Sequence, residues 1–326
     1  MEPETNKMKV DIILPVYQPK RWVFDAVDSI KSQTYRHWNL IIVDDHTPAS
    51  REVMRKMRKK AQSHPKIKFI RLEKNSKPAG ARNRALAQGK GEFIAFIDQD
   101  DKWHSRKLEK CMGYLKSHPQ IDLVHSDIEA MDEKGEVNKN QFDKENKKRA
   151  EIPYSRLQSK ELMRELARFY SLRFGTIVVR RSALEAMGGF DESFFGGEEF
   201  VFTLRFAARY RMVHLAEKLT FRRLHQGNLS KNRNRIIGEL NAYKKMRLEF
   251  PLLETLLKKK QRRALQEAIK VKLINREKKE AVRYSQELIR LAPLSFSVYC
   301  FYLMSVICFT PKCVRWIEFI KKKIHV

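Results

Sequence analysis

The chain has 326 residues, of which 42% are hydrophobic and 10% aromatic, and at roughly 100–200 residues per domain this length predicts one large domain or two smaller ones. That apolar content is enough for a core and excludes a wholly disordered chain. With 67 Lys and Arg against 39 Asp and Glu, the net charge of +28 indicates an anionic partner: nucleic acid, a membrane surface or a phosphorylated ligand.

The first 130 residues alternate between short apolar runs and amphipathic stretches with helical spacing. The expected strands cover residues 10–16, 40–43, 67–72, 93–97 and 121–125, and the expected helices cover 22–30, 51–61, 79–87 and 105–116. This alternation predicts an α/β fold built from βαβ units on a mostly parallel sheet. Ligands of such sheets bind beyond the carboxyl ends of the strands, so the residues that follow each strand are the first candidates for a site.

The pattern changes after residue 131. Residues 132–159 are polar and lysine-rich, and we expect a long excursion that is either mobile or a lid. A strand at 175–179 and helices at 182–187 and 202–210 follow. The rest of the chain is strongly basic and helical almost to its end, so we predict two domains, 1–232 and a basic α-helical extension at 233–326.

Acidic residues follow two of the predicted strands in this otherwise basic chain. Asp44 and Asp45 come after the second strand, and Asp98, Asp100 and Asp101 come after the fourth. In an extended chain, residues two apart point the same way, so Asp98 and Asp100 would present carboxylates to one spot. Such a pair suits Mg²⁺ or Mn²⁺, which binds oxygen ligands and keeps other positions for water and phosphate. The alternative is an ordinary Asp-rich turn, and the second acidic pair at another strand end argues against it.

The residues around these clusters resemble the inverting nucleotide-sugar glycosyltransferases of family 2, which have the GT-A fold, and in particular bacterial enzymes that build surface polysaccharide or lipopolysaccharide. The segments that match, in the family's order, are VDIILPVY (10–17), SQTY (32–35), LIIVDDH (40–46), PAGARNRAL (78–86), GEFIAFIDQDDKW (91–103), FGTIVVR (174–180), GGFD (188–191), GEEFVFTLR (197–205) and RLHQGNLS (223–230). The resemblance covers about residues 10–232 and implies a Rossmann-like GT-A domain with a mostly parallel sheet and flanking helices.

The resemblance implies a binding site for a nucleotide-sugar donor, expected to be a UDP-sugar. Pro15 and Tyr17 would line the pocket for the base and ribose, and Asp45 would accept a hydrogen bond from the uracil ring. Arg82, at the head of a predicted helix, would lie near the nucleotide. Asp98 would contact the ribose or the metal.

The resemblance also implies a metal site and a catalytic base. Asp100 would be the firmest ligand of Mn²⁺ or Mg²⁺, with Asp98 and His225 completing the shell. In an inverting transfer, a base takes the proton of the acceptor hydroxyl while that oxygen attacks the anomeric carbon. The family usually has Glu-Asp at the base position, and its Asp is the base. This chain has Glu198 and Glu199, so we assign the base to Glu199, whose side chain is one methylene longer.

The basic tail indicates a membrane surface. Residues 291–309 contain no charge, and 311–324 combine an apolar face with flanking Lys and Arg. Three interpretations are a helix lying in the interface of an anionic membrane, a helix docked on the catalytic domain, and a membrane span. We favour the first, at the cytoplasmic face of the inner membrane, because it would hold the enzyme near a glycan or lipid-linked acceptor.

Two other classes of function remain as alternatives. A nucleic-acid-binding protein would account for the charge, but the basic excess is concentrated in the tail and acidic clusters occupy the strand ends, so no nucleic acid is expected. A non-catalytic scaffold that kept the fold would account for the Glu-Glu departure. The four cysteines contain no CxxC pair and the first residues, MEPETNKMKV, contain no apolar run, so we expect reduced thiols and no secretory signal peptide.

Overall fold

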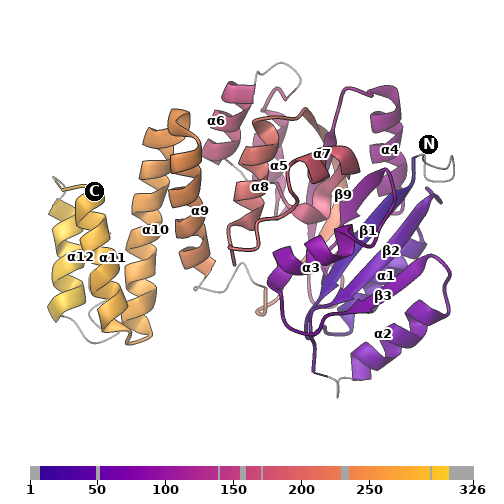
Figure 1. Cartoon of the computed structure of the whole chain (residues 1–326), viewed down its shortest axis with the longest axis horizontal. Helices are drawn as coiled ribbons and strands as arrows, with labels where there is room; N and C mark the ends of the chain where they lie inside the picture. Colours follow the sequence, from indigo (N-terminus) through magenta and orange to yellow (C-terminus); the bar gives the residue numbers. More distant parts are fainter. Residues whose placement is uncertain are drawn as a thin grey trace. The chain divides into compact units, whose positions relative to one another are not determined.

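The structure is a computed structural model of the chain, and it describes residues 8–48, 52–138, 140–154, 159–169, 172–228, 235–293 and 296–307. The chain divides into two compact units, Met1–Gln226 and Gly227–Val326 (Figure 1).

The first unit alternates strands and helices from its start. Its strands are β1 Val10–Val16, β2 Trp38–Asp44, β3 Ile67–Arg71, β4 Phe93–Phe96, β5 Lys102–Trp103, β6 Leu123–Met131, β7 Val137–Asn138, β8 Ile177–Arg180 and β9 Met212–Arg223. Its helices are α1 Trp22–Lys31, α2 Glu52–Gln62, α3 Lys77–Leu86, α4 Lys107–Ser117, α5 Asp143–Ala150, α6 Ser159–Phe169, the 3₁₀ turn η2 Phe174–Thr176, α7 Arg181–Ala186 and α8 Glu198–Ala207.

The strands of the described residues form one sheet in the order β3-β2-β1-β4-β8-β6-β9-β5, with β7 paired to β6. The expected parallel arrangement is present in β3-β2-β1-β4, where each neighbour pairs in parallel. Beyond β4 the sheet is mixed, because β8 runs antiparallel to both β4 and β6 while β9 runs parallel to β6. The parallel half sets the site, since three of its strands end at the same edge of the sheet.

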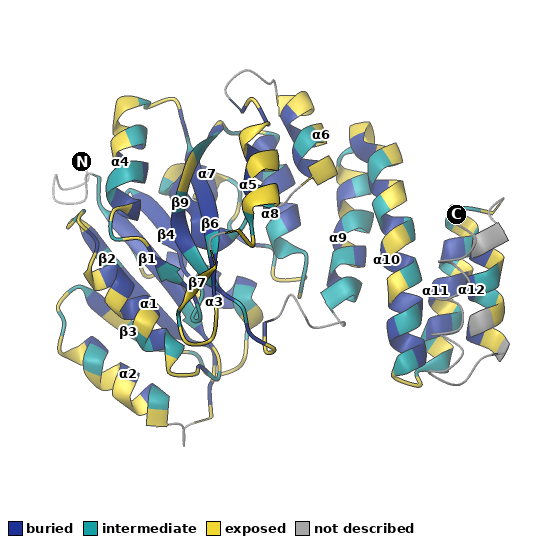
Figure 2. Cartoon of the chain, turned by 180° about the vertical axis from the view of Figure 1, so that it is seen from behind, coloured by how far each residue is buried: buried dark blue, intermediate teal, exposed yellow. Residues whose placement is uncertain are grey.

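Helices α1, α2 and α4 contribute to one apolar cluster with the inward-facing residues of the sheet. Figure 2 shows the strands buried and the outward faces of these helices exposed, as the amphipathic spacing predicts. Strand β9 was not predicted from the sequence. Its segment MVHLAEKLTFRR has no continuous apolar run, which agrees with a strand most of whose residues are partly buried or exposed.

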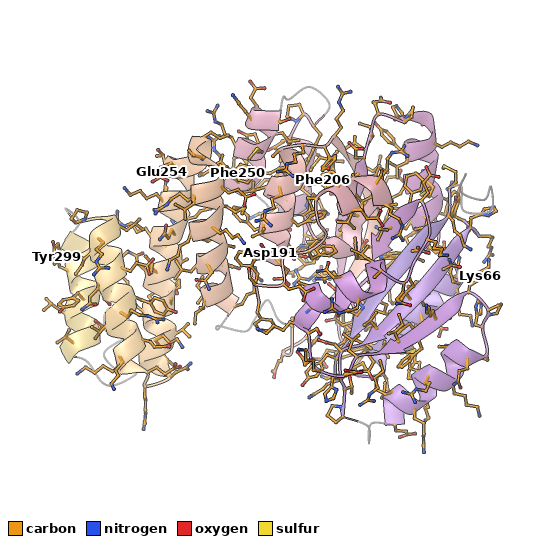
Figure 3. All side chains as sticks on the ribbon, viewed as in Figure 1. Lys66, Asp191, Phe206, Phe250, Glu254 and Tyr299 are labelled. Atoms are coloured by element: carbon orange, nitrogen blue, oxygen red, sulfur yellow. The ribbon has the colours of Figure 1, made fainter. Side chains whose placement is uncertain are left out.

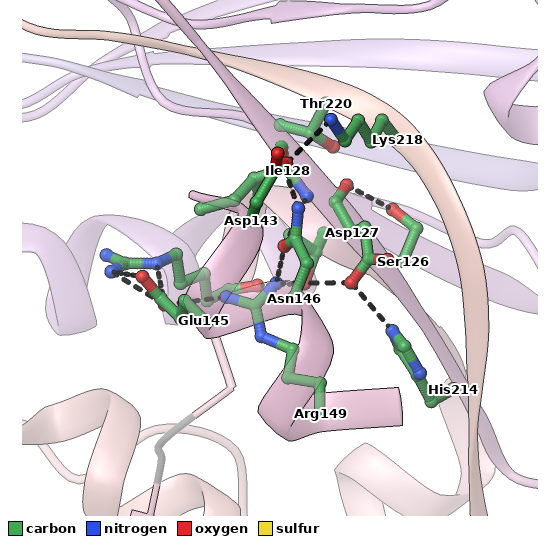
Figure 4. A network of polar contacts seen from close by, with 12 residues as sticks. Ser126, Asp127, Ile128, Asp143, Glu145, Asn146, Arg149, His214, Lys218 and Thr220 are labelled. Atoms are coloured by element: carbon green, nitrogen blue, oxygen red, sulfur yellow. Dashed lines mark hydrogen bonds and ion pairs between the residues drawn. The ribbon is translucent and has the colours of Figure 1, made fainter. Parts of the chain in front are cut away.

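The polar excursion after residue 131 contains a packed helix, so the prediction of a mobile segment is wrong for α5, while a lid stays a prediction. Asn146 is buried on α5 and pairs with the backbone of Ile128 in β6, donating to its carbonyl at 2.8 Å and accepting from its N–H at 3.3 Å (Figure 4). Ile128 lies next to an irregularity in the β6–β9 register, where ladder bonds are missing. The buried Arg149 adds ion pairs to Asp127 and Glu145. The high lysine content therefore gave no sign of a helix whose polar side chains pair with β6 where its register with β9 is irregular.

The second unit consists of α9 Arg235–Glu249, a 3₁₀ turn Pro251–Leu253, α10 Glu254–Ile274, α11 Lys278–Leu291 and α12 Phe296–Ile307. Apolar residues of all four helices, among them Leu240, Ile269, Leu288 and Phe301, form its core. In the described part of the chain, no helix has the length and apolar content needed to cross a membrane. The predicted amphipathic segment 311–324 lies outside the described residues.

Lys107, the first residue of α4, is completely buried in the first unit. Its Nζ donates to the Thr176 carbonyl at 2.9 Å, to Thr220 Oγ1 at 3.2 Å and to Ser126 Oγ at 3.5 Å. Burial lowers the pKa of Lys107 to about 8, because the charged amine loses its hydration. In the unfolded chain the amine titrates near its ordinary value of about 10.4.

We expect Lys107 to make folding stability depend on alkaline pH. Between pH 8 and the unfolded value, the native amine has lost a proton that the unfolded chain keeps, so its contribution to stability rises with pH. Below pH 8 both states are charged and the native state bears the full desolvation cost. In Lys107→Met this dependence is absent, so the free energy of unfolding of the parent relative to the variant should rise by about 3 kcal/mol between pH 7 and 10.5.

Urea unfolding followed by tryptophan fluorescence at several pH values measures this difference. Lys110→Met is the matched control, because Lys110 lies on the same helix in a surface ion pair with Glu217. A parent-to-variant difference that is the same at pH 7 and 10.5 contradicts the prediction.

Candidate active site

The ends of β1, β2 and β4 bring the predicted donor-site residues to one edge of the sheet. The Asp45 N–H donates to the Val16 carbonyl at 2.8 Å, which joins the end of β2 to the end of β1. The Tyr17 N–H donates to Gln99 Oε1 at 2.9 Å, and Gln99 Nε2 donates to the Tyr17 carbonyl at 3.2 Å. The end of β1, which contains Pro15 and Tyr17, therefore lies between the acidic segments that follow β2 and β4.

Asp45 is buried and held by the loop that precedes α3. Its Oδ1 accepts the Ser76 N–H at 2.6 Å, and its carbonyl accepts from Asn75 Nδ2 at 3.2 Å. Desolvation raises the pKa of Asp45, and the N–H groups of Ser76 and Lys77 oppose that rise. These contacts fix the orientation of a carboxylate at the edge of the sheet, where it can accept a hydrogen bond from a ligand.

Arg82 and Asp98 form the next contact along this edge. Arg82 is only 5% exposed, and its Nη2 donates to Asp98 Oδ1 at 3.3 Å. The guanidinium carbon lies 4.3 Å from the centre of the Phe174 ring. Among the described groups, Arg82 Nε and Nη1 have no hydrogen-bond partner. The charge of Arg82 is therefore balanced by one carboxylate and an aromatic face.

Three carboxylates are crowded at the end of β4. The Asp98 side chain keeps 43% of its surface open, yet surrounding protein atoms desolvate it and raise its pKa; Arg82 opposes this and the charge of Asp100 adds to it. Asp101 is more deeply buried. Desolvation, followed by the charges of Asp100 and Asp98, raises its pKa well above the ordinary value. The fold thus holds together negative charges that repel one another, which is characteristic of a site that binds a cation.

His225, which follows β9, lies beside this cluster. Its Nε2 forms a hydrogen bond of 2.8 Å with Asp100 Oδ2. The indole of Trp22, the first residue of α1, packs against the imidazole with ring centres 4.5 Å apart. The structure therefore brings two of the three predicted metal ligands, Asp100 and His225, into direct contact, while the third, Asp98, pairs with Arg82.

These residues fit a divalent cation that is shared with a substrate. In the described chain, no three His, Cys, Asp or Glu side chains converge as a complete metal site. Mg²⁺ and Mn²⁺ are commonly held by one or two side chains, with substrate phosphate oxygens and water at the other positions. Asp100 and His225 supply the oxygen and nitrogen donors for such a site, and the repulsion among the neighbouring carboxylates would be relieved by the positive charge.

Glu199, the predicted base, enters the same site from α8. Gly196 and Gly197 both have φ of +87°, a left-handed conformation that turns the chain sharply before the helix begins at Glu198. Glu199 Oε1 accepts the N–H of Phe174 at 3.1 Å. Desolvation raises the pKa of Glu199; Arg173 opposes this, while Asp98 and Glu198 add to it. Phe174, whose ring lies against Arg82, thus links Glu199 to Arg82 and, through Arg82, to Asp98.

Arg223 is a supporting residue to which sequence analysis gave no role. It is completely buried at the end of β9. Its N–H donates to Asp101 Oδ1 and its Nε donates to the Asp100 carbonyl, both at 3.0 Å. The remaining guanidinium nitrogens bind Asp25 of α1 at 2.7 Å and the carbonyls at 132 and 133 at 3.1 Å. Arg223 therefore joins the acidic segment after β4 to β9, to α1 and to the loop after β6, and only its place two residues before His225 in the sequence hinted at this.

Phe174 also went unassigned, although it lies in a segment that resembles the family. Its N–H binds Glu199 and its ring supports Arg82, so one residue contacts both the base side and the donor side of the site. No sequence signal marks it, because a backbone N–H is present at every residue except proline.

A solved structure with a similar fold is TarS of Staphylococcus aureus, residues 1–349, in complex with UDP-GlcNAc. It superposes with a TM-score of 0.61 at 17% identity and covers 91% of this chain and 89% of that one. At this identity the likeness shows the fold alone, which is the expected GT-A-like α/β architecture.

Curated relatives match over shorter segments. TuaG of Bacillus subtilis, whose name assigns it to teichuronic acid biosynthesis as a glycosyltransferase, is 38% identical over 110 residues, which are 33% of this chain and 42% of TuaG. WfgD of Escherichia coli, named UDP-Glc:alpha-D-GlcNAc-diphosphoundecaprenol beta-1,3-glucosyltransferase, is 31% identical over 130 residues, 40% of this chain and 49% of WfgD. The chain thus matches less than half of the length of each of these relatives.

The family model described as glycosyl transferase family 2 matches residues 11–188, more than half of the chain. That segment includes the ends of β1, β2 and β4 with their acidic residues, as well as Arg82 and Phe174. The chain belongs to glycosyl transferase family 2.

Proposed function

We propose that the chain is a metal-dependent, inverting glycosyltransferase that moves a sugar from a UDP-sugar to a hydroxyl of a glycan or lipid-linked acceptor in surface-polysaccharide biosynthesis. The observation that supports this most is the meeting of Asp98, Asp100, Arg82, His225 and Glu199 beyond the strand ends. Family membership and the names of TuaG and WfgD support the reaction and the kind of product.

The donor would bind along the ends of β1, β2 and β4. Pro15 and Tyr17 offer one wall for the base and ribose, and Asp45 is oriented by Ser76 to accept a hydrogen bond from the uracil imide. Asp98 and Arg82 lie next along the edge, where the ribose and the diphosphate would follow. The UDP-GlcNAc bound by TarS and the UDP-Glc in the name of WfgD agree with this choice of nucleotide.

Asp100 and His225, with Asp98 beside them, would hold the divalent cation. When bound, Mn²⁺ or Mg²⁺ would stabilise the negative charge that develops on the departing diphosphate. Trp22 and Arg223 keep His225 and the Asp100 backbone in place, so the ligands are oriented before the donor arrives.

Glu199 would remove the proton from the acceptor hydroxyl as that oxygen attacks the anomeric carbon. A base works best when its pKa lies near the operating pH, and desolvation raises the pKa of Glu199 in that direction. The N–H of Phe174 binds one carboxylate oxygen and leaves the proton to be taken by the other. Glu199 is one methylene longer than the family's usual Asp, and the hydrogen bond from Phe174 would hold this longer side chain in a defined position.

The second unit would bind an anionic membrane surface near the acceptor. On α12, Tyr299, Leu303 and Val306 are exposed at helical spacing and form one apolar face, while Val298 and Phe301 are buried on the other. Tyr299 points outward from the helix bundle in Figure 3. Basic residues of the unit, such as Lys279, Arg283 and Arg290, would add attraction to anionic lipids.

Asp100→Asn should lose metal-dependent donor binding and keep its fold. The amide removes the charge of a proposed metal ligand, so we expect at least about a tenfold weaker affinity for UDP in the presence of Mn²⁺. Thermal unfolding of the full chain, with UDP or UDP-sugars and with or without Mn²⁺, measures this as a lost stabilisation.

Asp28→Asn is the matched control, because the Asp28 side chain lies on the surface of α1 and forms an ion pair with Lys60. Equal Mn²⁺-dependent stabilisation in the parent and in Asp100→Asn argues against the metal site. Salt-sensitive DNA binding with no response to UDP would favour the nucleic-acid-binding alternative.

Glu199→Gln should separate catalysis from donor binding. The amide cannot accept the hydroxyl proton, so kcat should fall by about 10²–10⁴-fold while the affinity for UDP stays within about twofold. Steady-state transfer assays and UDP titrations measure the two effects, with Glu185→Gln on the surface of α7 as the control. Retention of kcat in Glu199→Gln would remove this residue from the role of base.

Replacing Tyr299 and Leu303 together by serine should weaken binding to anionic vesicles. Burial of one such side chain contributes about 1.5–3 kcal/mol, so the double variant should lose at least about tenfold in partition coefficient. Co-sedimentation with phosphatidylglycerol vesicles measures this, and Leu248→Ser on α9 is a control with an exposed leucine elsewhere in the unit. Unchanged partitioning of the double variant would exclude α12 as the contact surface.

A further inference from the structure

The 3₁₀ turn Phe174–Thr176 lies directly behind the proposed catalytic base. Phe174 gives its N–H to Glu199 Oε1 at 3.1 Å. The carbonyl groups of the other two residues, Gly175 and Thr176, accept hydrogen bonds from buried side chains of the first unit. The position of the Glu199 carboxylate therefore depends on what holds this turn.

Gly175 is held by two side chains from β5 and β9. Its carbonyl accepts from Trp103 Nε1 at 3.1 Å and from Thr220 Oγ1 at 3.0 Å. A Cβ at position 175 would lie 3.6 Å from Asp101 Oδ2 and 3.7 Å from Thr220 Cγ2, so the turn passes in van der Waals range of the acidic segment. The turn thus borders both the carboxylate cluster after β4 and the base on α8.

Lys107 completes this support. Its three N–H groups meet three acceptors: the Thr176 carbonyl, Thr220 Oγ1 and Ser126 Oγ. Because Thr220 itself donates to Gly175, Lys107 holds the turn once directly and once through Thr220. All of these groups are buried, so water does not compete for the hydrogen bonds.

Burying the charged amine of Lys107 costs desolvation free energy, which an apolar side chain that only filled the space would not. A methionine of similar length would fill the same space without the desolvation cost, and no carboxylate is among the hydrogen-bond partners found for Lys107 in the described residues. What the amine supplies and methionine lacks is the set of donors to the turn and to Thr220.

We propose that Lys107 is a positioning residue of the transferase site: through the Phe174–Thr176 turn it fixes the N–H that orients the Glu199 carboxylate. The inference rests on the proposed role of Glu199 as the base. In this proposal Lys107 acts through the turn that it holds, and so through the Phe174 N–H that binds Glu199.

Lys107→Met tests this in the full chain, with Thr220→Val as a second, nearly isosteric variant that removes one hydroxyl and no charge. In both variants the turn should loosen, and amide exchange at Phe174 in the unliganded protein should speed up by about tenfold or more. The kcat for transfer from a UDP-sugar should fall by about tenfold, since a base displaced by a fraction of an ångström loses alignment. The KM for the donor should stay within about twofold, because Asp45 is held by Ser76, and Asp100 and His225 are held by each other and by Trp22.

Lys110→Met, on the same helix but in a surface ion pair, is the control and should match the parent in both measurements. If Lys107→Met does not fold, Thr220→Val alone decides the matter. Exchange at Phe174 and kcat equal to those of the control overturn the inference, and so does a rise in donor KM that matches the fall in kcat. If the parent transfers no sugar, the proposed function fails, and the exchange measurement still shows whether Lys107 holds the turn.

Discussion

The central constraint in this protein is the electrostatic repulsion among carboxylates at one edge of the sheet. Asp98, Asp100 and Asp101 follow the same strand, and Glu199 reaches the same environment from α8. Burial and mutual charge raise the pKa of Asp98, Asp101 and Glu199, so the unliganded site is less favourable than separated charges in water would be. The arrangement persists because the parallel pairing of β1 with β2 and β4 fixes where these strands end, and the acidic residues follow directly.

The surrounding structure restrains this cluster with cations and fixed dipoles. Arg82 balances Asp98 from α3, and Arg223 binds the backbone of Asp100 and the side chain of Asp101 from β9. His225 binds the Asp100 carboxylate on its other side. Each contact comes from a different element, so the site is a point at which the sheet, the helices and the segment after β9 are joined. A cation bound there would complete a balance of charge that the protein alone leaves partial.

Glu199, the proposed base, has a separate support that extends into the core. The Phe174 N–H is a fixed dipole, and its place is set by buried donors on β5, β9 and α4. The turn Phe174–Thr176 thus borders Asp101 of the acidic cluster at Gly175 and binds Glu199, the proposed base, at Phe174. This connection gives a physical reason why a fully buried lysine, normally unfavourable, can persist in a protein interior.

Much of the fold could be predicted from the sequence, because apolar runs and helical spacing are local signals. The predicted strands at 10–16 and 67–72 and the predicted helix at 22–30 agree with β1, β3 and α1 within a residue or two, and the acidic pairs were expected where they are found. The prediction failed where local pattern and tertiary role diverge. The lysine-rich stretch around α5 looked mobile, yet Asn146 is buried there because it pairs with the backbone of Ile128 in β6, and Arg149 is buried because it pairs with Asp127 and Glu145. Strand β9 has no apolar run in its sequence, because most of its residues are partly buried or exposed.

The sequence by itself determined the alternating α/β plan, the acidic strand ends and the family, since spacing and residue type along the chain are sufficient for these. Only the tertiary structure decided that Asp98 pairs with Arg82 while Asp100 pairs with His225, and that Lys107, Thr220 and Trp103 hold the turn behind Glu199. The physical reason is that hydrogen bonds and desolvation depend on distances between residues far apart in the chain. Those distances are set by how the sheet and helices pack, and no local pattern in the sequence records them.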